Sequence, residues 1–115
     1  MNKSSGDGIT IMRYIGDETT VVIPAQIDGV AVLHLSPNAF ADTAVRRVVL
    51  PEGFCCIQNR SFANCVYLEE IVIPASVWFI ANNAFVGSGD FVIVTTAGSY
   101  AHSFAQRHGI PVRLI

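Results

Sequence analysis

Charged residues are scarce in this chain, and the few present form no block. Only 14% of the 115 residues are charged, with seven bases against nine acids, which gives a net charge of −2. A nucleic-acid-binding surface needs clustered lysine and arginine side chains. The charge pattern therefore predicts that nucleic acid is not a partner.

Long hydrophobic runs are missing as well. The purely apolar runs are only a few residues long, whereas a membrane-spanning helix needs about 20 apolar residues. The start, MNKSSGDG, is polar and glycine-rich, which does not fit a signal peptide. We therefore predict no membrane span, and we interpret residues 1–8 as a flexible segment.

Cysteine and glycine motifs of the common functional sites are also lacking. The chain has three cysteines, an odd number that excludes a fully paired disulfide framework. Two of them are neighbours, Cys55 and Cys56, and adjacent cysteines rarely bond each other because the geometry is strained. There is no glycine-rich phosphate loop, and His34, His102 and His108 lack the i, i+4 spacing of a helical metal site. The sequence thus predicts neither a cofactor nor a metal ion.

What the chain does have is an excess of apolar residues, 51% of the total, arranged in a repeat. Pro51 and Pro74 are 23 residues apart, as are Phe62 and Phe85. Each unit contains a short strand ending in Ile-Pro or Leu-Pro, then an Ala-Phe or Ser-Phe pair, then a turn. The first unit carries an insertion around QIDGV, whose Asp-Gly pair predicts a turn. A unit of this length cannot bury its own apolar face, so the units must stack.

The repeat aligns apolar residues in columns. The equivalent positions are Val32, Phe54 and Val77; Leu35, Ile57 and Ile80; Phe40, Phe62 and Phe85; Val45, Leu68 and Phe91; and Val48, Ile71 and Val94. A column that is apolar in every unit predicts a ladder of buried side chains through a solenoid core.

The two ends of the repeat need caps, because a solenoid otherwise exposes its terminal core. Residues 9–23 contain two β-rich runs around a Gly-Asp pair, which predicts an N-terminal hairpin cap. Residues 97–115 predict a helix with Ser99 as its N-cap and Gly109 at its C-terminal end, followed by a strand in the final VRLI. The repeats themselves are expected at residues 24–96.

The segment SFANCVYLEEIVIPASVWFIANNAF shows the repeat most clearly, and there the chain resembles the BspA-type leucine-rich repeats of bacterial cell-surface and secreted proteins. The resemblance covers residues 9–115 as one domain. It implies a mostly β, right-handed α/β repeat solenoid, here with about three coils of roughly 23 residues. It also implies an adhesive or binding role without catalysis, at the cell surface or in secretion. The missing signal peptide and the unpaired thiols favour the cytoplasm instead.

A Cys65-centred reactive site is the first chemical alternative. Cys65 aligns with Thr43 and Ser88, and Asn64 aligns with other turn-forming residues. A repeating position filled by small residues indicates packing rather than nucleophilic chemistry. One coil apart, Arg46 and Arg47 align with the acids of the Glu-Glu pair at 69–70. These residues predict ion pairs across neighbouring strands rather than acid catalysis.

The positions between the buried columns should point outward, and they carry the candidate binding residues. Leu33, Cys55 and Trp78 form one predicted outer column, and His34, Cys56 and Phe79 form the next. A second apolar stripe is predicted along the other strands, at Val22, Val49, Val72 and Thr95. Large aromatics on a rigid surface are typical anchors for a partner. The alternative, that the insertion or the cap covers some of them, stays open.

Three functions are compatible with these features. The leading hypothesis is a non-catalytic module that binds a protein or a glycan through Leu33, His34, Trp78, Phe79, Val49 and Val72. The second is a structural module that forms homodimers through its apolar face or a sheet edge. The third is a cysteine hydrolase built on Cys56 and His34, which requires a reactive thiolate.

Overall fold

The computed structural model describes residues 2–5 and 8–115, with side chains described from residue 8 onward. Its strands are β1 (Asn2–Ser5), β2 (Gly8–Ile11), β3 (Thr20–Val22), β4 (Gln26–Ile27), β5 (Val30–Leu35), β6 (Arg47–Val49), β7 (Cys56–Ile57), β8 (Glu70–Val72), β9 (Phe79–Ile80), β10 (Val92–Thr95) and β11 (Val112–Leu114). Its helix, α1, spans Tyr100–His108.

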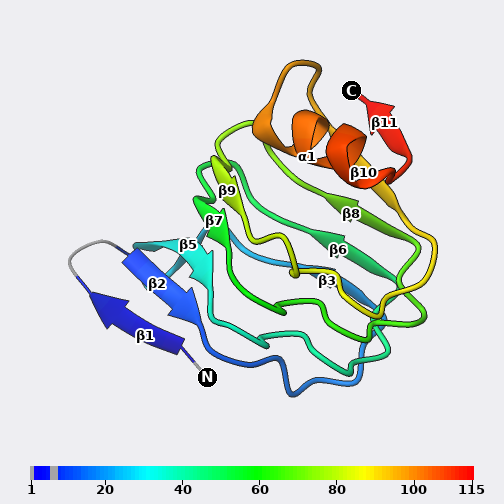
Figure 1. Ribbon diagram of the computed structural model, residues 1–115. Helices are drawn as coiled ribbons and strands as arrows, with labels where there is room; N and C mark the ends of the chain where they lie inside the picture. Colours follow the sequence, from blue (N-terminus) through cyan, green and yellow to red (C-terminus); the bar gives the residue numbers. More distant parts are fainter. Residues whose placement is uncertain (1, 6–7) are drawn as a thin grey trace.

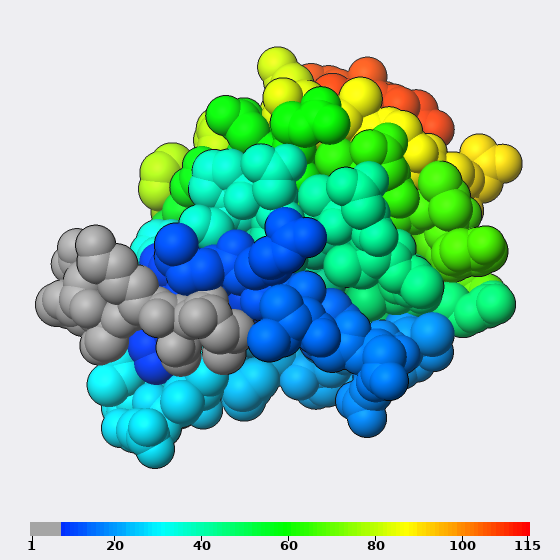
Figure 2. Space-filling view, turned by 90° about the horizontal axis from the view of Figure 1, so that it is seen from below, coloured from blue at the N-terminus to red at the C-terminus, as the bar shows by residue number. Residues whose placement is uncertain are grey.

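The chain winds as a solenoid with a sheet on each of two sides (Figure 1). The first sheet has the strand order β1-β2-β5-β7-β9, with β4 paired to β5, and the second has the order β11-β10-β8-β6-β3. The pairs between successive coils are parallel. From the N-terminal end, the coils follow one another in chain order from blue towards orange (Figure 2). The predicted mostly β solenoid is therefore confirmed.

The core consists of the predicted columns, except that Ile93 rather than Val94 continues the column of Val48 and Ile71. Leu35 is in register with Ile57, and Ile57 with Ile80; all three are at most 1% exposed. Phe62 is fully buried, and its ring stacks on those of Phe40 and Phe85 with centroids 5.1 and 5.4 Å apart. Burying each such side chain stabilises the fold by roughly 1.5–3 kcal/mol. The ladder supplies much of the stability that a single coil could not reach.

A third side of the coils is joined by hydrogen bonds between turns. The Phe40 amide donates to the Ser61 carbonyl at 2.7 Å, and the Phe62 amide donates to the Ala84 carbonyl at 2.8 Å. Side chains add to this ladder, because Ser88 Oγ donates to the Phe62 carbonyl at 2.7 Å. Each coil is therefore tied to its neighbour on all three sides.

The N-terminal hairpin predicted at residues 9–23 is wrong. Strand β2 lies in the first sheet beside β5, and β3 lies in the second sheet beside β6. Tyr14 stacks on Phe40 with ring centroids 5.1 Å apart, so it continues the phenylalanine ladder. Residues 9–23 are thus a coil of the solenoid, because their apolar side chains fill the same columns as the later units.

The hairpin that does exist joins β1 and β2, which pair antiparallel. The predicted flexible segment, residues 1–8, includes this β1 strand, whereas its residues 1, 6 and 7 lie outside the described residues. The count of three coils also changes, since the second sheet has five strands and the solenoid about five turns.

The insertion and the C-terminal helix match their sequence signals. Asp28 and Gly29 have φ of 52° and 79°, which closes the antiparallel β4–β5 pair. At the start of α1, Ser99 Oγ accepts from the His102 amide at 3.1 Å, and Gly109 follows the helix with φ of 67°. Within the described residues, no helix has the length and apolar character needed to cross a membrane.

The predicted register of the last repeat is off by one residue. Ile71 pairs with Ile93 rather than Val94, and Val72 pairs with Val94 rather than Thr95. Coils two and three contain one more residue here than coil four. In coil two the amides of Arg46 and Arg47 both donate to the Thr19 carbonyl, and in coil three those of Glu69 and Glu70 both donate to the Arg46 carbonyl. The fourth coil lacks this residue, so Thr95 points inward and is fully buried. Its hydroxyl donates to the Ile73 carbonyl at 2.6 Å.

Candidate functional site

The predicted binding residues fall on two separate faces. Leu33 and His34 lie on β5, Phe79 lies on β9, and Trp78 directly precedes β9. Main-chain hydrogen bonds place them in neighbouring rows, since the Cys55 amide donates to the Leu33 carbonyl and the Trp78 amide to the Cys55 carbonyl. The first sheet therefore brings these four residues together.

Val49 and Val72 lie on the second sheet, in register with each other on β6 and β8. Both are partly exposed, and Val22 beside them is 64% exposed. The next residue of this stripe is Val94 rather than Thr95, and it is buried. The second face is thus a short apolar stripe that ends at β10, and the structure does not join it to the first face.

The aromatic pair Trp78–Phe79 is the most exposed part of the first face. Trp78 is 65% exposed and Phe79 is 36% exposed, and their ring centroids lie 6.2 Å apart at a tilt of 52°. Trp78 Nε1 donates to Cys55 Sγ at 3.1 Å. This hydrogen bond orients the indole, most of which stays exposed to solvent.

A pocket of about 530 Å³ opens beside Phe79. The side chains of Asn59, Asn82, Asn83 and Tyr100 line it together with Phe79. Sequence analysis missed this pocket, because Tyr100 reaches it only through the docking of α1 against the last coil. The asparagines gave no signal either, since single amides in turns are common.

The thiol of Cys65 has the structural role that its alignment predicts. It is fully buried, and its Sγ donates to the Phe40 carbonyl at 3.1 Å. Burial raises the pKa of the Cys65 thiol, which opposes formation of a nucleophilic thiolate. The turn beside it uses left-handed residues in successive coils, with φ of 58° at Asn64 and 79° at Gly87.

The structure brings Cys56 and His34, the two groups of the hydrolase hypothesis, into contact, but the Cys56 thiol is not in the reactive, deprotonated form. Cys56 Sγ lies 3.4 Å from His34 Nδ1. Cys56 was expected to point outward and is instead 5% exposed. This burial, together with the Cys55 thiol beside it, raises the pKa of Cys56 to about 12. A thiol with that pKa is protonated at neutral pH and lacks the thiolate that a cysteine nucleophile needs.

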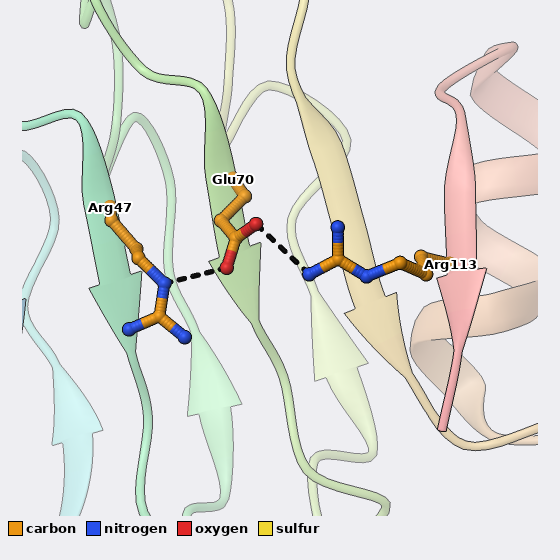
Figure 3. Close-up of polar contacts among 3 residues, drawn as sticks. All are labelled: Arg47, Glu70 and Arg113. Atoms are coloured by element: carbon orange, nitrogen blue, oxygen red, sulfur yellow. Dashed lines mark hydrogen bonds and ion pairs between the residues drawn. The ribbon is translucent and has the colours of Figure 1, made fainter.

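The predicted ion pairs form between neighbouring coils. Arg46 Nη1 lies 2.8 Å from Glu69 Oε2, and Arg47 Nε lies 2.6 Å from Glu70 Oε2. Arg113 on β11 joins them, with its Nη2 3.0 Å from Glu70 Oε1. Figure 3 shows Glu70 between the two guanidinium groups, with Arg113 reaching across β10. The bridge connects the last strand to the third coil. This contact could not be predicted from the sequence, because the register of β11 was not known.

Because of this bridge, the free energy of unfolding should decrease at acidic pH. The hydrogen bond from Arg47, aided by Arg113, lowers the pKa of Glu70 below its ordinary 4.5. A lowered carboxyl pKa adds stability above the unfolded value, and this stability is lost as the pH falls below about 4.5. Glu70→Gln should cost on the order of 1 kcal/mol at pH 7, because the bridge is partly exposed. Urea unfolding should show this difference shrinking at pH 3.

A matched control is Glu52→Gln, which removes an exposed carboxylate outside this bridge. Its free energy of unfolding should follow the wild-type pH profile within about 0.5 kcal/mol. Equal pH profiles for wild type and Glu70→Gln would show that the bridge contributes nothing to stability.

Comparison with protein-family models identifies the repeat. A family model described as BspA type leucine rich repeat region (6 copies) matches residues 32–104. The matched region begins within β5 and ends within α1, so it contains the phenylalanine ladder and the Trp78–Phe79 pair. No curated protein and no solved structure matches the chain.

Proposed function

The chain belongs to the BspA-type leucine-rich repeat family, and on this premise we propose that it is a non-catalytic interaction module that binds a protein or a glycan. Membership supports an interaction role, because stacked coils present extended, rigid surfaces. The surface that we assign to binding is the outer side of the first sheet, at Leu33, His34, Trp78 and Phe79.

The observation that carries this proposal is the exposure of two adjacent aromatic rings on a fixed backbone. Trp78 is 65% exposed although the same side chain donates a hydrogen bond to Cys55. Tryptophan is enriched among the residues that dominate binding energy. An indole already held in one orientation loses less conformational entropy when a partner covers it. Trp78 is therefore the anchor that we expect a partner to bury.

The pocket beside Phe79 supports a ligand with both polar and apolar faces. Three asparagine side chains and the ring of Tyr100 line it with Phe79. Binding sites commonly combine aromatic walls with a few polar groups that fix the orientation of the ligand. A sugar ring or a peptide side chain fits this description, which is why protein and glycan partners both belong to the proposal. The stripe at Val49 and Val72 is a second, smaller contact surface.

The place of action that we propose is the cell surface, in an adhesin-like context. The basis is the family, whose members are typically surface-associated. The cytoplasm remains the alternative place for this module.

Self-association is the second candidate function, and a sheet edge favours it. Strand β11 is the last strand of the second sheet. Its final residue, Leu114, is 47% exposed, and Ile115, which follows it, is 76% exposed. An exposed edge with apolar side chains can pair with a second copy of the same strand. A homodimer would then bury either this edge or the Trp78–Phe79 pair.

Light scattering on a sizing column separates the two functions. The binding module predicts a monomer for wild type and for Trp78→Ala, with and without reductant. The matched control is Tyr67→Ala, which removes another exposed aromatic, 56% exposed, that lies outside the Trp78–Phe79 face. A wild-type dimer that persists in Tyr67→Ala would establish self-association instead. Dissociation on Trp78→Ala would place the contact at the Trp78–Phe79 pair, and persistence in Trp78→Ala would place it at the β11 edge.

A ligand screen then tests the binding module itself. Wild type is presented to a glycan array and to a phage-displayed peptide library. We expect binders whose affinity falls about 30-fold or more on Trp78→Ala, since hot-spot residues contribute at least about 2 kcal/mol. Tyr67→Ala should retain binding. Absence of any Trp78-dependent binder in both screens would contradict the proposal.

A further inference from the structure

Three metal-ligand side chains converge on the first sheet. His34 on β5 is the register partner of Cys56 on β7, with His34 Nδ1 3.4 Å from Cys56 Sγ. Cys55 Sγ lies 2.6 Å from Cys56 Sγ. All three donor atoms lie within 4.8 Å of one another. Packing alone does not require two adjacent thiols and an imidazole to meet at one point.

The convergence of Cys55 and Cys56 follows from where the strand begins. Successive side chains of a regular strand point to opposite faces, but Cys55 precedes β7 and is outside the regular strand. Its main chain still bonds to both neighbouring coils, through the Leu33 carbonyl and the Trp78 amide. The two thiols can therefore lie on the same side while the backbone between them stays fixed.

The chemistry of this donor set selects a particular class of ion. Thiolate sulfur is a soft ligand that favours Zn²⁺ and Cu⁺, and imidazole suits both of these ions. Mg²⁺ and Ca²⁺ prefer oxygen ligands, which this cluster does not offer. Cys55 and His34 are partly exposed, so an ion could enter from solvent and keep a water molecule as a further ligand.

We propose that His34, Cys55 and Cys56 bind one thiophilic d¹⁰ metal ion, Zn²⁺ or Cu⁺, through one imidazole nitrogen and two thiolates. Each thiol loses its proton to solvent when its sulfur bonds to the ion. The positive charge of the ion stabilises the thiolates, so a coordinating thiol is deprotonated even where burial disfavours the free anion. This inference does not depend on the proposed binding function.

Coordination requires one small movement. Two sulfur ligands about 2.3 Å from a tetrahedral ion lie roughly 3.8 Å apart, which is farther than the present 2.6 Å. Cys56 is buried, whereas Cys55 is partly exposed. We therefore expect Cys55 Sγ to move outward while Cys56 and His34 stay in place.

Trp78 completes the surroundings of the cluster and reports on it. Its Nε1 donates to Cys55 Sγ at 3.1 Å, the kind of hydrogen bond that orients a metal ligand. It is also the only tryptophan in the chain. Binding of an ion at Cys55 should therefore change the tryptophan fluorescence of the whole protein.

The test is a metal titration of the full chain, stripped with a chelator and kept reduced with a phosphine. Zn²⁺, Co²⁺ as its coloured substitute, and Cu⁺ are each added against a competing chelator. Native mass spectrometry should show one ion per chain, with thiolate-to-metal absorption and altered Trp78 fluorescence at the same equivalence point. The relative affinities for Zn²⁺ and Cu⁺ identify the preferred ion, and Mg²⁺ should produce no change.

The variants decide whether these residues form the site. Cys55→Ser, Cys56→Ser and His34→Ala should each weaken binding by about tenfold or more, since even residues that only orient ligands contribute that much. Cys65→Ser is the matched control and should bind as wild type does, because Cys65 is buried in the ladder of turns. Circular dichroism checks the folding of each variant. If Cys56→Ser misfolds, Cys55→Ser still tests the site, because Cys55 is partly exposed and its replacement should not disturb the fold.

Three results would overturn the proposal. One is wild-type binding no tighter than that of the Cys55→Ser/Cys56→Ser double variant. Another is binding that disappears in Cys65→Ser. The third is His34→Ala binding with wild-type affinity, which would remove the imidazole from the site.

Discussion

Replacing Phe62 with alanine should destabilise the domain by about 3–5 kcal/mol, because it leaves a cavity in the middle of the ladder. Phe62 is fully buried and stacked on both sides, against Phe40 and Phe85. A domain of this size has a total stability of about 5–15 kcal/mol. Urea unfolding at pH 7, monitored by circular dichroism, measures the loss.

Two controls make this result specific. Phe62→Leu keeps most of the buried volume and should cost less than Phe62→Ala. Tyr67→Ala removes an exposed ring from the same coil and should change the free energy of unfolding by about 0.5 kcal/mol or less. A loss below about 1 kcal/mol for Phe62→Ala would mean that the ladder is not packed as described.

A carboxylate introduced between α1 and the core should detach this C-terminal helix from the last coil. Ala101 is fully buried on the inner face of α1, so Ala101→Asp would bury an unpaired charge. We expect a cost of at least about 3 kcal/mol. Detachment of α1 would uncover the end of the core, including Phe85 and Phe91. Light scattering should therefore show self-association that increases with protein concentration.

The matched control introduces the same charge on the same helix. Ser103→Asp lies two residues further along, on the exposed side of α1. An acid near a helix N-terminus is neutral or slightly stabilising, so this variant should stay monomeric with nearly wild-type stability. Equal behaviour of the two aspartate variants would show that the helix is not needed to cover the core.

The parts of the fold that sequence could predict are those that repeat with constant spacing. Phe62 and Phe85 are 23 residues apart, and both occupy the same ladder. The repeat pattern did not identify the first coil for two reasons. Tyr14 replaces the phenylalanine there, and the insertion after β3 changes the spacing from Tyr14 to Phe40. A Gly-Asp pair in that coil then suggested a hairpin, but burial of Ile9 and Ile11 in the core determined the winding.

The register error in the fourth coil has a different origin. From Phe91 to Val94 every residue is apolar, so a shift by one residue leaves the pattern unchanged. In the earlier coils, Arg47 and Glu70 mark the outward position, and the ion pairs there were predictable. Only the ladder of hydrogen bonds shows that Val94, and not Thr95, pairs with Val72.

The sequence could predict which residues of the candidate site occupy equivalent positions in successive coils, but not which of their side chains are in contact. Alignment placed His34, Cys56 and Phe79 in one column, and the register confirms that row. The spacing rules for metal sites consider residues close in sequence, whereas His34 and Cys56 are 22 positions apart. Their meeting with Cys55 depends on how one thiol turns at the start of a strand, which no pattern of residue types specifies.

The three-sided ladder of main-chain hydrogen bonds has a consequence for how the surface can vary. Adjacent strands in such a ladder are about 4.8 Å apart whatever their side chains, so the positions of outer residues are set by the backbone. If Leu33 and Trp78 bind a partner as proposed, a change at either residue should alter recognition while the inward columns maintain stability. Under that proposal, the surface that recognises a partner and the core that stabilises the fold would be subject to nearly independent selection.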